Sequence, residues 1–357
     1  MALIAMMLMG NAFGQSAKQL TTVTGKKIQV DQLNKLIQRT MDSLNIPGLS
    51  IAIINDAKMV YHNTFGVKNV ATNQPVNDSI LFEGASLSKP LFSYFLLKMV
   101  EKGVISLDTP LYKYMPHPGI KNNDERYKLI TPRIVLSHTT GFPNWSPDAP
   151  IPIKFTPGTD FSYSGEAHQY LTALLAVQMK TNWQAGLDSI FQKEVAIPLG
   201  MKHTYYVRNA FTGRNKAIGY FKDGRPKEGW ENGSISFGAA HTVHSEANDY
   251  AKFLIAMIKG EGLKKETFDD MLKEQIHFTK DNGGKELLPL GQTGWCLGFA
   301  MKPMLYGIRY MHTGVNSGFQ SYCCFNRDKK YGLVLFTNSE KAFELYDKIG
   351  KFLDDEF

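Results

Sequence analysis

One stretch of the chain, Pro90–Val100, is apolar on nearly every face of a helix, and it constrains the fold more than any other segment. A surface helix carries its apolar residues on one stripe, whereas a helix that is apolar all round is buried. The sequence therefore predicts a core helix inside a large protein. Two polar residues, Ser86 and Lys89, stand three positions apart at the head of this helix.

The length and composition of the chain fit such a core. The chain has 357 residues, 43% of them apolar and 20% charged, which is enough for one large domain or two ordinary ones. The net charge of +7 is mild, and no dense basic run or zinc-finger spacing occurs, so the sequence argues against nucleic-acid binding. A weak attraction to anionic surfaces such as a cell wall is compatible with this charge.

The N-terminus has the pattern of a secretory signal. Residues 1–14 hold a short apolar core that ends in Ala12-Phe13-Gly14, a small-x-small cleavage site. We therefore expect a signal peptide at 1–14 and a periplasmic or secreted mature protein; a frayed apolar helix is the alternative. No later segment reaches the ~20 apolar residues of a membrane span, so we expect no stable span.

Neither the cysteines nor the histidines predict a cross-link or a metal centre. Cys296, Cys323 and Cys324 are odd in number and lie in apolar strand-like runs, so we expect small core residues. His241 and His244 are three positions apart and could pair on a metal, but no third ligand has suitable spacing. We expect no metal and no organic cofactor.

Strand patterns lie at both ends of the chain, and helix patterns lie between them. The predicted elements are a helix at Asp31–Leu44, a hairpin at Leu49–Gly66, helices at Glu166–Gln178 and Ser245–Ile258, four antiparallel runs between Gly294 and Asn338, and a helix at Ser339–Phe352. This order predicts an α/β fold: an antiparallel sheet flanked by helices, built from both chain ends, with a large mostly helical subdomain inserted. We expect one domain at 15–357, with its α/β part at about 15–85 and 285–357 and its helical part at about 86–284.

The pair Ser86 and Lys89 has a chemical interpretation. Positions i and i+3 share a helix face, and a desolvated lysine has a lowered pKa, so the amine of Lys89 can activate the Ser86 hydroxyl as a nucleophile. Taken alone the spacing is weak, because a capping serine and a lysine that snorkels to solvent would look the same. The segment Gly84–Ser88 lacks the last glycine of Gly-x-Ser-x-Gly, which argues against an α/β-hydrolase.

Two further segments strengthen the chemical interpretation. Phe161–Gly165 places Tyr163 at the junction of a long loop and a helix. His312-Thr313-Gly314 ends a predicted strand, and an edge that ends in glycine lets a substrate backbone approach and pair with it.

In this order and spacing the three elements resemble those of the penicillin-binding-protein and class C β-lactamase group of serine acyl-enzymes. That group includes D-Ala-D-Ala carboxypeptidases, D-aminopeptidases and family VIII esterases, and its Ser-x-x-Lys signature is well known. The resemblance covers most of the mature chain and extends to Leu136–Pro143, Pro157–Gly165, His241–Leu254 and His312–Phe319.

The resemblance implies roles for several residues. Ser86 would be the nucleophile and Lys89 its activating partner, and Tyr163 would act as general base and acid with phenolate character supported by Lys89. His312 would take the Lys or His place of the third motif, and the backbone N–H groups of Ser86 and Val315 would form the oxyanion hole. The implied substrate-binding positions are Gly165, Thr313, Gly314 and Val315.

Two positions depart from the group's pattern. Gly165 stands where the second motif usually has an asparagine that contacts the substrate amide, and Val315 stands where many members offer a hydroxyl to the substrate carboxylate. These departures argue against strong β-lactam and D-Ala-D-Ala recognition and leave the acyl-transfer groups in place.

The resulting expectation is a serine hydrolase that forms an acyl-enzyme on a small ester, amide or peptide. Two alternatives stay open: a penicillin-binding-like module that is acylated by β-lactams or binds peptidoglycan peptides with little turnover, and a class C-type β-lactamase. Among the remaining candidates, we expect His138 to brace a loop and Glu166 to be a solvated acid at a helix start. Trp145 is either a rim of the substrate cleft or an ordinary aromatic residue.

Overall fold

The structure is a computed structural model that describes residues 19–117, 119–120, 124–147, 150–229 and 233–355. The signal peptide expected at 1–14 lies outside these residues and stays a prediction. Within the described ranges, no helix is both long enough and apolar enough to cross a bilayer.

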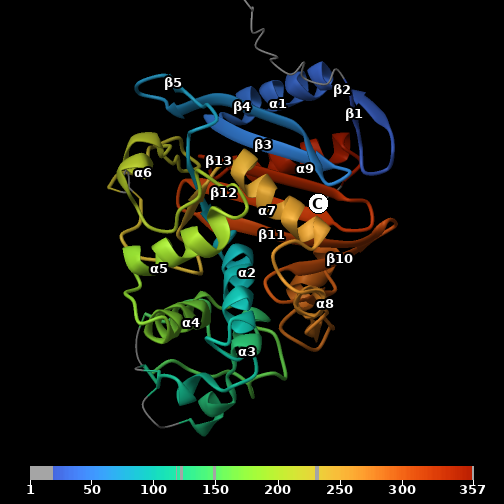
Figure 1. Ribbon diagram of the computed structural model, residues 1–357. Helices are drawn as coiled ribbons and strands as arrows, with labels where there is room; N and C mark the ends of the chain where they lie inside the picture. The colour runs from blue at the N-terminus through green and yellow to red at the C-terminus, as the bar shows by residue number, and fades with distance from the viewer. Residues whose placement is uncertain (1–18, 118, 121–123, 148–149, 230–232, 356–357) are drawn as a thin grey trace, which may run out of the picture.

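A nine-stranded sheet forms one layer of the molecule (Figure 1). In spatial order its strands are β5 (Gln74–Pro75), β4 (Lys58–Asn69), β3 (Gly48–Asn55), β13 (Tyr331–Thr337), β12 (Phe319–Asn326), β11 (Gly307–Asn316), β10 (Ala300–Met304), β9 (Gly294–Trp295) and β8 (Ile276–His277). Neighbouring strands run antiparallel throughout. Because β3 pairs with β13, the sheet joins the two ends of the chain, which confirms the predicted architecture.

Helices cover both faces of this sheet. Successive side chains of a strand point to opposite faces; on β3, Ile51 packs in the core beneath α1 (Val30–Leu44) and α9 (Ala342–Phe352). Its neighbour Ala52 lies in the core on the opposite face, where α7 (Ala247–Lys259) packs against β3 and β13. The sheet therefore lies between two layers of helices, α1 and α9 on one face and α7 on the other (Figure 1).

Beyond α7 lies the mostly helical part. Its elements are α2 (Ser88–Glu101), α3 (Pro132–Leu136), α4 (Gly165–Gln178), α5 (Ala185–Phe191), α6 (Ala210–Asn215), α8 (Lys265–Leu272), the short helices η1 (Leu111–Lys113), η2 (Glu125–Leu129), η3 (Gln192–Ala196) and η4 (Lys285–Leu290), and the small sheet of β6 with β7 (Phe82–Ala85, Val243–Ser245). A second small sheet, β1 with β2 (Gln19–Thr21, Lys27–Gln29), lies at the other end of the molecule, beside α1 (Figure 1). Helix α2 is buried over most of its length, which confirms the predicted core helix. Helix α7 and strand β8 come from the 86–284 stretch but contact the sheet.

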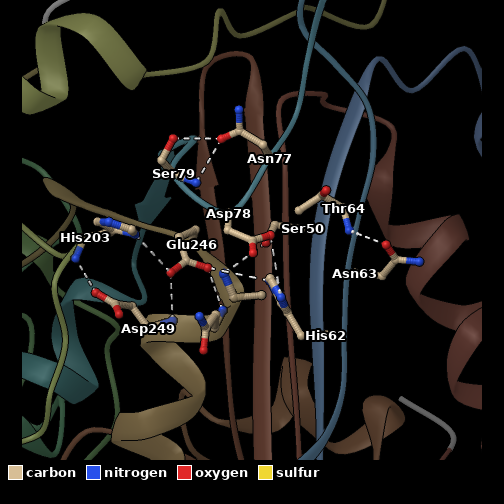
Figure 2. Close-up of polar contacts among 12 residues, drawn as sticks. Ser50, His62, Asn63, Thr64, Asn77, Asp78, Ser79, His203, Glu246 and Asp249 are labelled. Carbon is tan, nitrogen blue, oxygen red and sulfur yellow. Dashed lines mark hydrogen bonds and ion pairs between the residues drawn. The ribbon is translucent and has the colours of Figure 1, made fainter. Parts of the chain in front are cut away.

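A polar cluster fixes the start of α7 (Figure 2). The buried carboxylate of Glu246 caps the helix and accepts hydrogen bonds from the N–H groups of Asn248 and Asp249, at 2.6 and 3.0 Å. The rings of His62 on β4 and of His203 lie 3.8 and 3.6 Å from its oxygens. Since β7 directly precedes Glu246 and pairs with β6, this cluster also fixes the strand that leads to Ser86.

The cysteines behave as predicted. Cys296, Cys323 and Cys324 are free thiols in the buried core. Burial raises the pKa of the Cys296 and Cys323 thiols to about 12, so these thiols stay protonated at neutral pH. They serve as small apolar side chains.

Candidate active site

Ser86 sits on a tight turn between β6 and α2. Ala85, which precedes it, has a φ of 49°, in the left-handed region that a non-glycine residue rarely adopts. The turn is held by Ser88, whose hydroxyl donates to the Ala85 carbonyl at 2.6 Å and accepts from the Val243 N–H at 2.9 Å. This geometry leaves Ser86 partly exposed at the head of a buried helix.

Lys89 lies directly beneath Ser86. Its Nζ is 3.3 Å from Ser86 Oγ and donates to the carbonyl of Ala240 at 2.8 Å. The side chain is 1% exposed, and this burial lowers the pKa of Lys89 to about 7. A substantial fraction of the amine is therefore neutral near pH 7 and can accept the hydroxyl proton of Ser86.

Tyr163 approaches Ser86 from the helical side. It precedes Ser164, whose hydroxyl caps α4 by accepting from the Ala167 N–H at 3.0 Å. The Tyr163 hydroxyl hydrogen-bonds to Ser86, and Lys89 Nζ lies 4.6 Å from the centre of the Tyr163 ring. Burial raises the pKa of Tyr163 despite the bond to Ser86, so the phenol keeps its proton. These electrostatics favour Lys89 over the expected Tyr163 phenolate as the base.

His138 braces Tyr163, in agreement with its predicted role. Its own backbone has a φ of 58°, and its Nδ1 accepts from the Ser164 N–H at 3.0 Å. This bond leaves the ring proton on Nε2. The imidazole stacks on the Tyr163 ring with centroids 4.2 Å apart and planes 26° apart. Burial holds the pKa of His138 well below its usual value, so the stacked ring is neutral.

The segment His312-Thr313-Gly314 forms an open strand edge. β10 pairs with β11 only up to Met311, so the residues from His312 onward have β12 as their one partner among the described strands. The His312 ring lies 6.1 Å from the Tyr163 ring, and its Nδ1 is 2.7 Å from the Thr313 carbonyl. Burial, followed by the nearby Lys89, lowers the pKa of His312 to about 3, so this ring is neutral at pH 7.

Gly314 lets this edge lie directly against the Ser86 turn. A Cβ at this position would stand 2.1 Å from Ser321 Oγ and 2.3 Å from the Gly84 carbonyl oxygen, so a larger residue would push β11 away from β6. Thr313 and Val315 are exposed, and Val315 retains 56% of its surface.

A cavity of about 900 Å³ joins most of these groups. It is lined by Ser86, Tyr163, His312, Thr313 and Val315 together with aromatic and apolar residues, chiefly Phe161, Leu287, Leu290 and Trp295. Lys89 lies below it. Gly314 and Gly165 are buried and are absent from the described lining.

Three groups in the site were missed by the sequence reasoning. The first is the Ala240 carbonyl, a backbone group that no residue type reveals. The second is Trp295, whose ring contacts the rings of Tyr163 and His312; the sequence predicted only that it lies near the start of a strand. Asn144 follows Pro143 in a loop that was singled out by its length; its Oδ1 accepts from the Gly165 N–H at 2.9 Å.

The other polar candidates fit structural roles. Glu166 lies in the first turn of α4 and accepts from the Ser146 N–H at 3.2 Å. His244 lies on β7, and His241 precedes that strand. In the portion of the chain that the structure describes, no group of three or more His, Cys, Asp or Glu side chains is placed to hold a metal.

Curated proteins with similar sequences include a β-lactamase and a protein named flp. The β-lactamase of Escherichia coli K12 is 24% identical over 86% of this chain and 89% of its own length. Protein flp of Staphylococcus aureus MW2 is 24% identical over 53% of this chain. That match spans 41% of the flp sequence, so this chain matches less than half of the length of flp.

Solved structures show the same fold. An octameric penicillin-binding protein homologue from Pyrococcus abyssi aligns with a TM-score of 0.76 at 23% identity, over 91% of this chain and 77% of the other. The D-alanine carboxypeptidase AmpC from Burkholderia cenocepacia aligns with a TM-score of 0.74 at 22% identity, over 91% and 99%. The family model described as Beta-lactamase matches residues 33–353, and the chain accordingly belongs to the β-lactamase family.

Proposed function

We propose that the protein is a serine hydrolase that forms an acyl-enzyme on Ser86. One observation carries this proposal: at the wall of a cavity, Ser86 Oγ lies 3.3 Å from the buried amine of Lys89 and hydrogen-bonds to the half-buried phenol of Tyr163. A structural serine does not need two proton-transfer partners. From the pattern of residues 1–14 we also propose that the protein acts in the periplasm or outside the cell.

In the acylation step, Ser86 Oγ attacks the carbonyl carbon of an ester or amide, and its proton passes to the neutral Lys89 amine. The negative charge on the carbonyl oxygen is stabilised by the backbone N–H groups of Ser86 and Val315. The bond to the leaving group then breaks, and Tyr163 delivers a proton to the leaving oxygen or nitrogen while Lys89 replaces that proton.

In the deacylation step, a water molecule attacks the acyl carbon and gives its proton to the same pair of groups. The Ser86–acyl bond breaks, Ser86 Oγ regains a proton, and the carboxylic acid leaves. The sum is one ester or amide plus one water, giving one acid plus one alcohol or amine. No oxidant and no metal-bound step is involved.

The pH dependence should report the Lys89 amine. Because burial lowers the pKa of Lys89 to about 7, kcat/KM for a neutral ester should be low below this pH and rise to a plateau above it. Steady-state rates between about pH 5 and about pH 9 would measure this. Lys98→Gln, on the exposed side of the same helix, should keep the profile unchanged; a flat wild-type profile would exclude Lys89 as the titrating base.

Substrate choice should favour esters over β-lactams. A nitrophenyl ester should have a kcat/KM roughly a hundredfold or more above that of a chromogenic cephalosporin, because neither Gly165 nor Val315 offers a polar side chain to the substrate. Val315→Ser should recover part of the cephalosporin activity. A wild-type protein that hydrolyses the cephalosporin faster than the ester contradicts this proposal.

The second candidate function is a binding module that is acylated without turnover. Its support is the family itself, since solved relatives include a penicillin-binding protein homologue. Stopped-flow kinetics separates the two: an enzyme gives a burst followed by a steady rate, whereas a module gives one stoichiometric burst. Product that continues to accumulate beyond one equivalent per protein excludes the binding module.

A further inference from the structure

The space next to Gly165 is occupied by an aromatic ring. A Cβ at Gly165 would lie 2.6 Å from Trp145 Cζ2 and 2.7 Å from Cη2, both on the six-membered ring of the indole. The ring therefore packs flush on the glycine at the start of α4. The neighbouring Asn144 fixes this contact from both directions: its Oδ1 accepts from the Gly165 N–H, and its carbonyl accepts from the Glu166 N–H, each at 2.9 Å.

The Trp145 ring also contacts the chain segment that holds Lys89. The ring stands edge-on to His241 with centroids 5.2 Å apart and planes 86° apart. His241 directly follows Ala240, the residue whose carbonyl holds Lys89. Burial lowers the pKa of His241 to about 4, so this contact involves a neutral imidazole. The indole thus connects Gly165, two residues after Tyr163, with His241, and it still exposes 48% of its surface.

Two consecutive residues at the end of β11 line two different cavities. Val315 lines the large cavity that contains Tyr163 and His312. Its neighbour Asn316 lines a second cavity, of about 340 Å³, whose wall includes His241. A carbonyl whose oxygen lies at the Val315 N–H would thus sit between the two cavities. Its two substituents diverge from the carbonyl carbon, so each could enter a different cavity.

The chemistry assigns one cavity to each substituent. Tyr163 delivers a proton to the leaving group, so the leaving group must enter the large cavity, which Tyr163 lines. The acyl group then points toward the second cavity, whose wall includes His241, the residue that the Trp145 ring contacts. Two exposed apolar side chains belong to this side: Ile235, which is 63% exposed and lines the second cavity, and Trp145, which contacts His241 of that cavity.

We propose that the Trp145 indole is the surface on which the acyl group of the substrate packs, and that it selects apolar acyl groups, aromatic ones above all. This inference rests on the proposed hydrolase function and names its substrate class: esters and amides of apolar carboxylic acids. An exposed, immobilised indole offers a large contact area with few degrees of freedom to lose. Gly165 has no side chain, and the space beside it is filled by the apolar ring of Trp145 from the preceding loop.

The kinetic test varies the acyl group at a constant nitrophenolate leaving group. Wild-type kcat/KM should be about tenfold higher for the phenylacetyl ester than for the acetyl ester. Trp145→Ala should remove most of this ratio by lowering the phenylacetyl value, and Trp145→Phe should retain it. Trp183→Ala removes an indole of similar exposure far along the sequence, on no wall of the site, and should leave the ratio unchanged.

A second test avoids turnover. The binding of phenylacetamide and of acetamide to the Ser86→Ala protein is titrated by ligand-observed NMR and repeated with Ser86→Ala/Trp145→Ala. The preference for phenylacetamide should fall about tenfold in the double variant. The paired variant Gly165→Asn should lose activity in the presence of Trp145, because the two side chains claim one space, and regain it in Gly165→Asn/Trp145→Ala.

The outcomes separate the two proposals. Turnover with an acyl preference that survives Trp145→Ala overturns the role of Trp145 and leaves the hydrolase intact. Binding that depends on Trp145 without any turnover or any adduct on Ser86 overturns the hydrolase and supports the apolar binding surface. Equal binding of both amides to the two Ser86→Ala proteins overturns the Trp145 proposal whether or not turnover occurs.

Discussion

Ser86→Ala is expected to lower kcat/KM by ~10³-fold or more and to abolish covalent labelling by a fluorophosphonate probe. The reason is geometric: Ser86 Oγ lies 3.3 Å from Lys89 Nζ, hydrogen-bonds to Tyr163 and lines the cavity. Removing the hydroxyl removes the atom that forms the acyl bond, whereas the hydrogen bonds that hold the turn belong to Ser88 and remain. Intact-mass spectrometry should find one adduct on the wild type and none on the variant.

Ser93→Ala is the matched control for this prediction. Ser93 lies one turn beyond Lys89 on α2, is fully buried, and donates its hydroxyl to the Lys89 carbonyl at 2.9 Å, so its removal perturbs the same helix without touching the turn. The adduct should form in full on this variant. An unchanged adduct on Ser86→Ala would place the nucleophile elsewhere.

The features that the sequence predicts well are those with local causes. Helix α2 is apolar on every face, so its burial follows from periodicity alone. The hairpin of β3 and β4 follows from two strand-like runs joined by a turn at 55–57, and the structure confirms the pair. The spacing of Ser86 and Lys89 predicts their proximity, although Ser86 lies in the turn just before α2: the Lys89 N–H donates to the Ser86 carbonyl at 3.0 Å, so the two side chains still meet.

The features that could not be predicted depend on contacts between distant segments. The Ala240 carbonyl that holds Lys89 lies 151 residues away, and a backbone oxygen leaves no trace in a sequence. The packing of Trp145 on Gly165 depends on the path of a long loop, which neither residue's type reveals. The protonation of Tyr163 depends on burial, and burial is set by the whole fold.

Removing Lys89 and removing Tyr163 should each cost about as much as removing both. The two groups share one proton path through Ser86, since Lys89 Nζ contacts Ser86 Oγ and lies 4.6 Å from the Tyr163 ring. Residues that act as one unit give grossly non-additive losses. We expect each of Lys89→Met and Tyr163→Phe to lower kcat/KM by ~10³-fold, and the double variant to fall only slightly further.

The chosen substitutions keep the shapes of the two side chains. Methionine preserves much of the apolar volume of the buried lysine and removes a desolvated amine, so the variant should fold; the Tyr163→Phe ring can still stack on His138. Thermal unfolding of all three variants checks this. If the losses multiply, so that the double variant falls by the product of the single effects, Lys89 and Tyr163 act independently and the shared proton path is wrong. If they do not, the free energy lost on breaking the path once is the whole loss, which is the signature of one proton passing between Ser86, Lys89 and Tyr163.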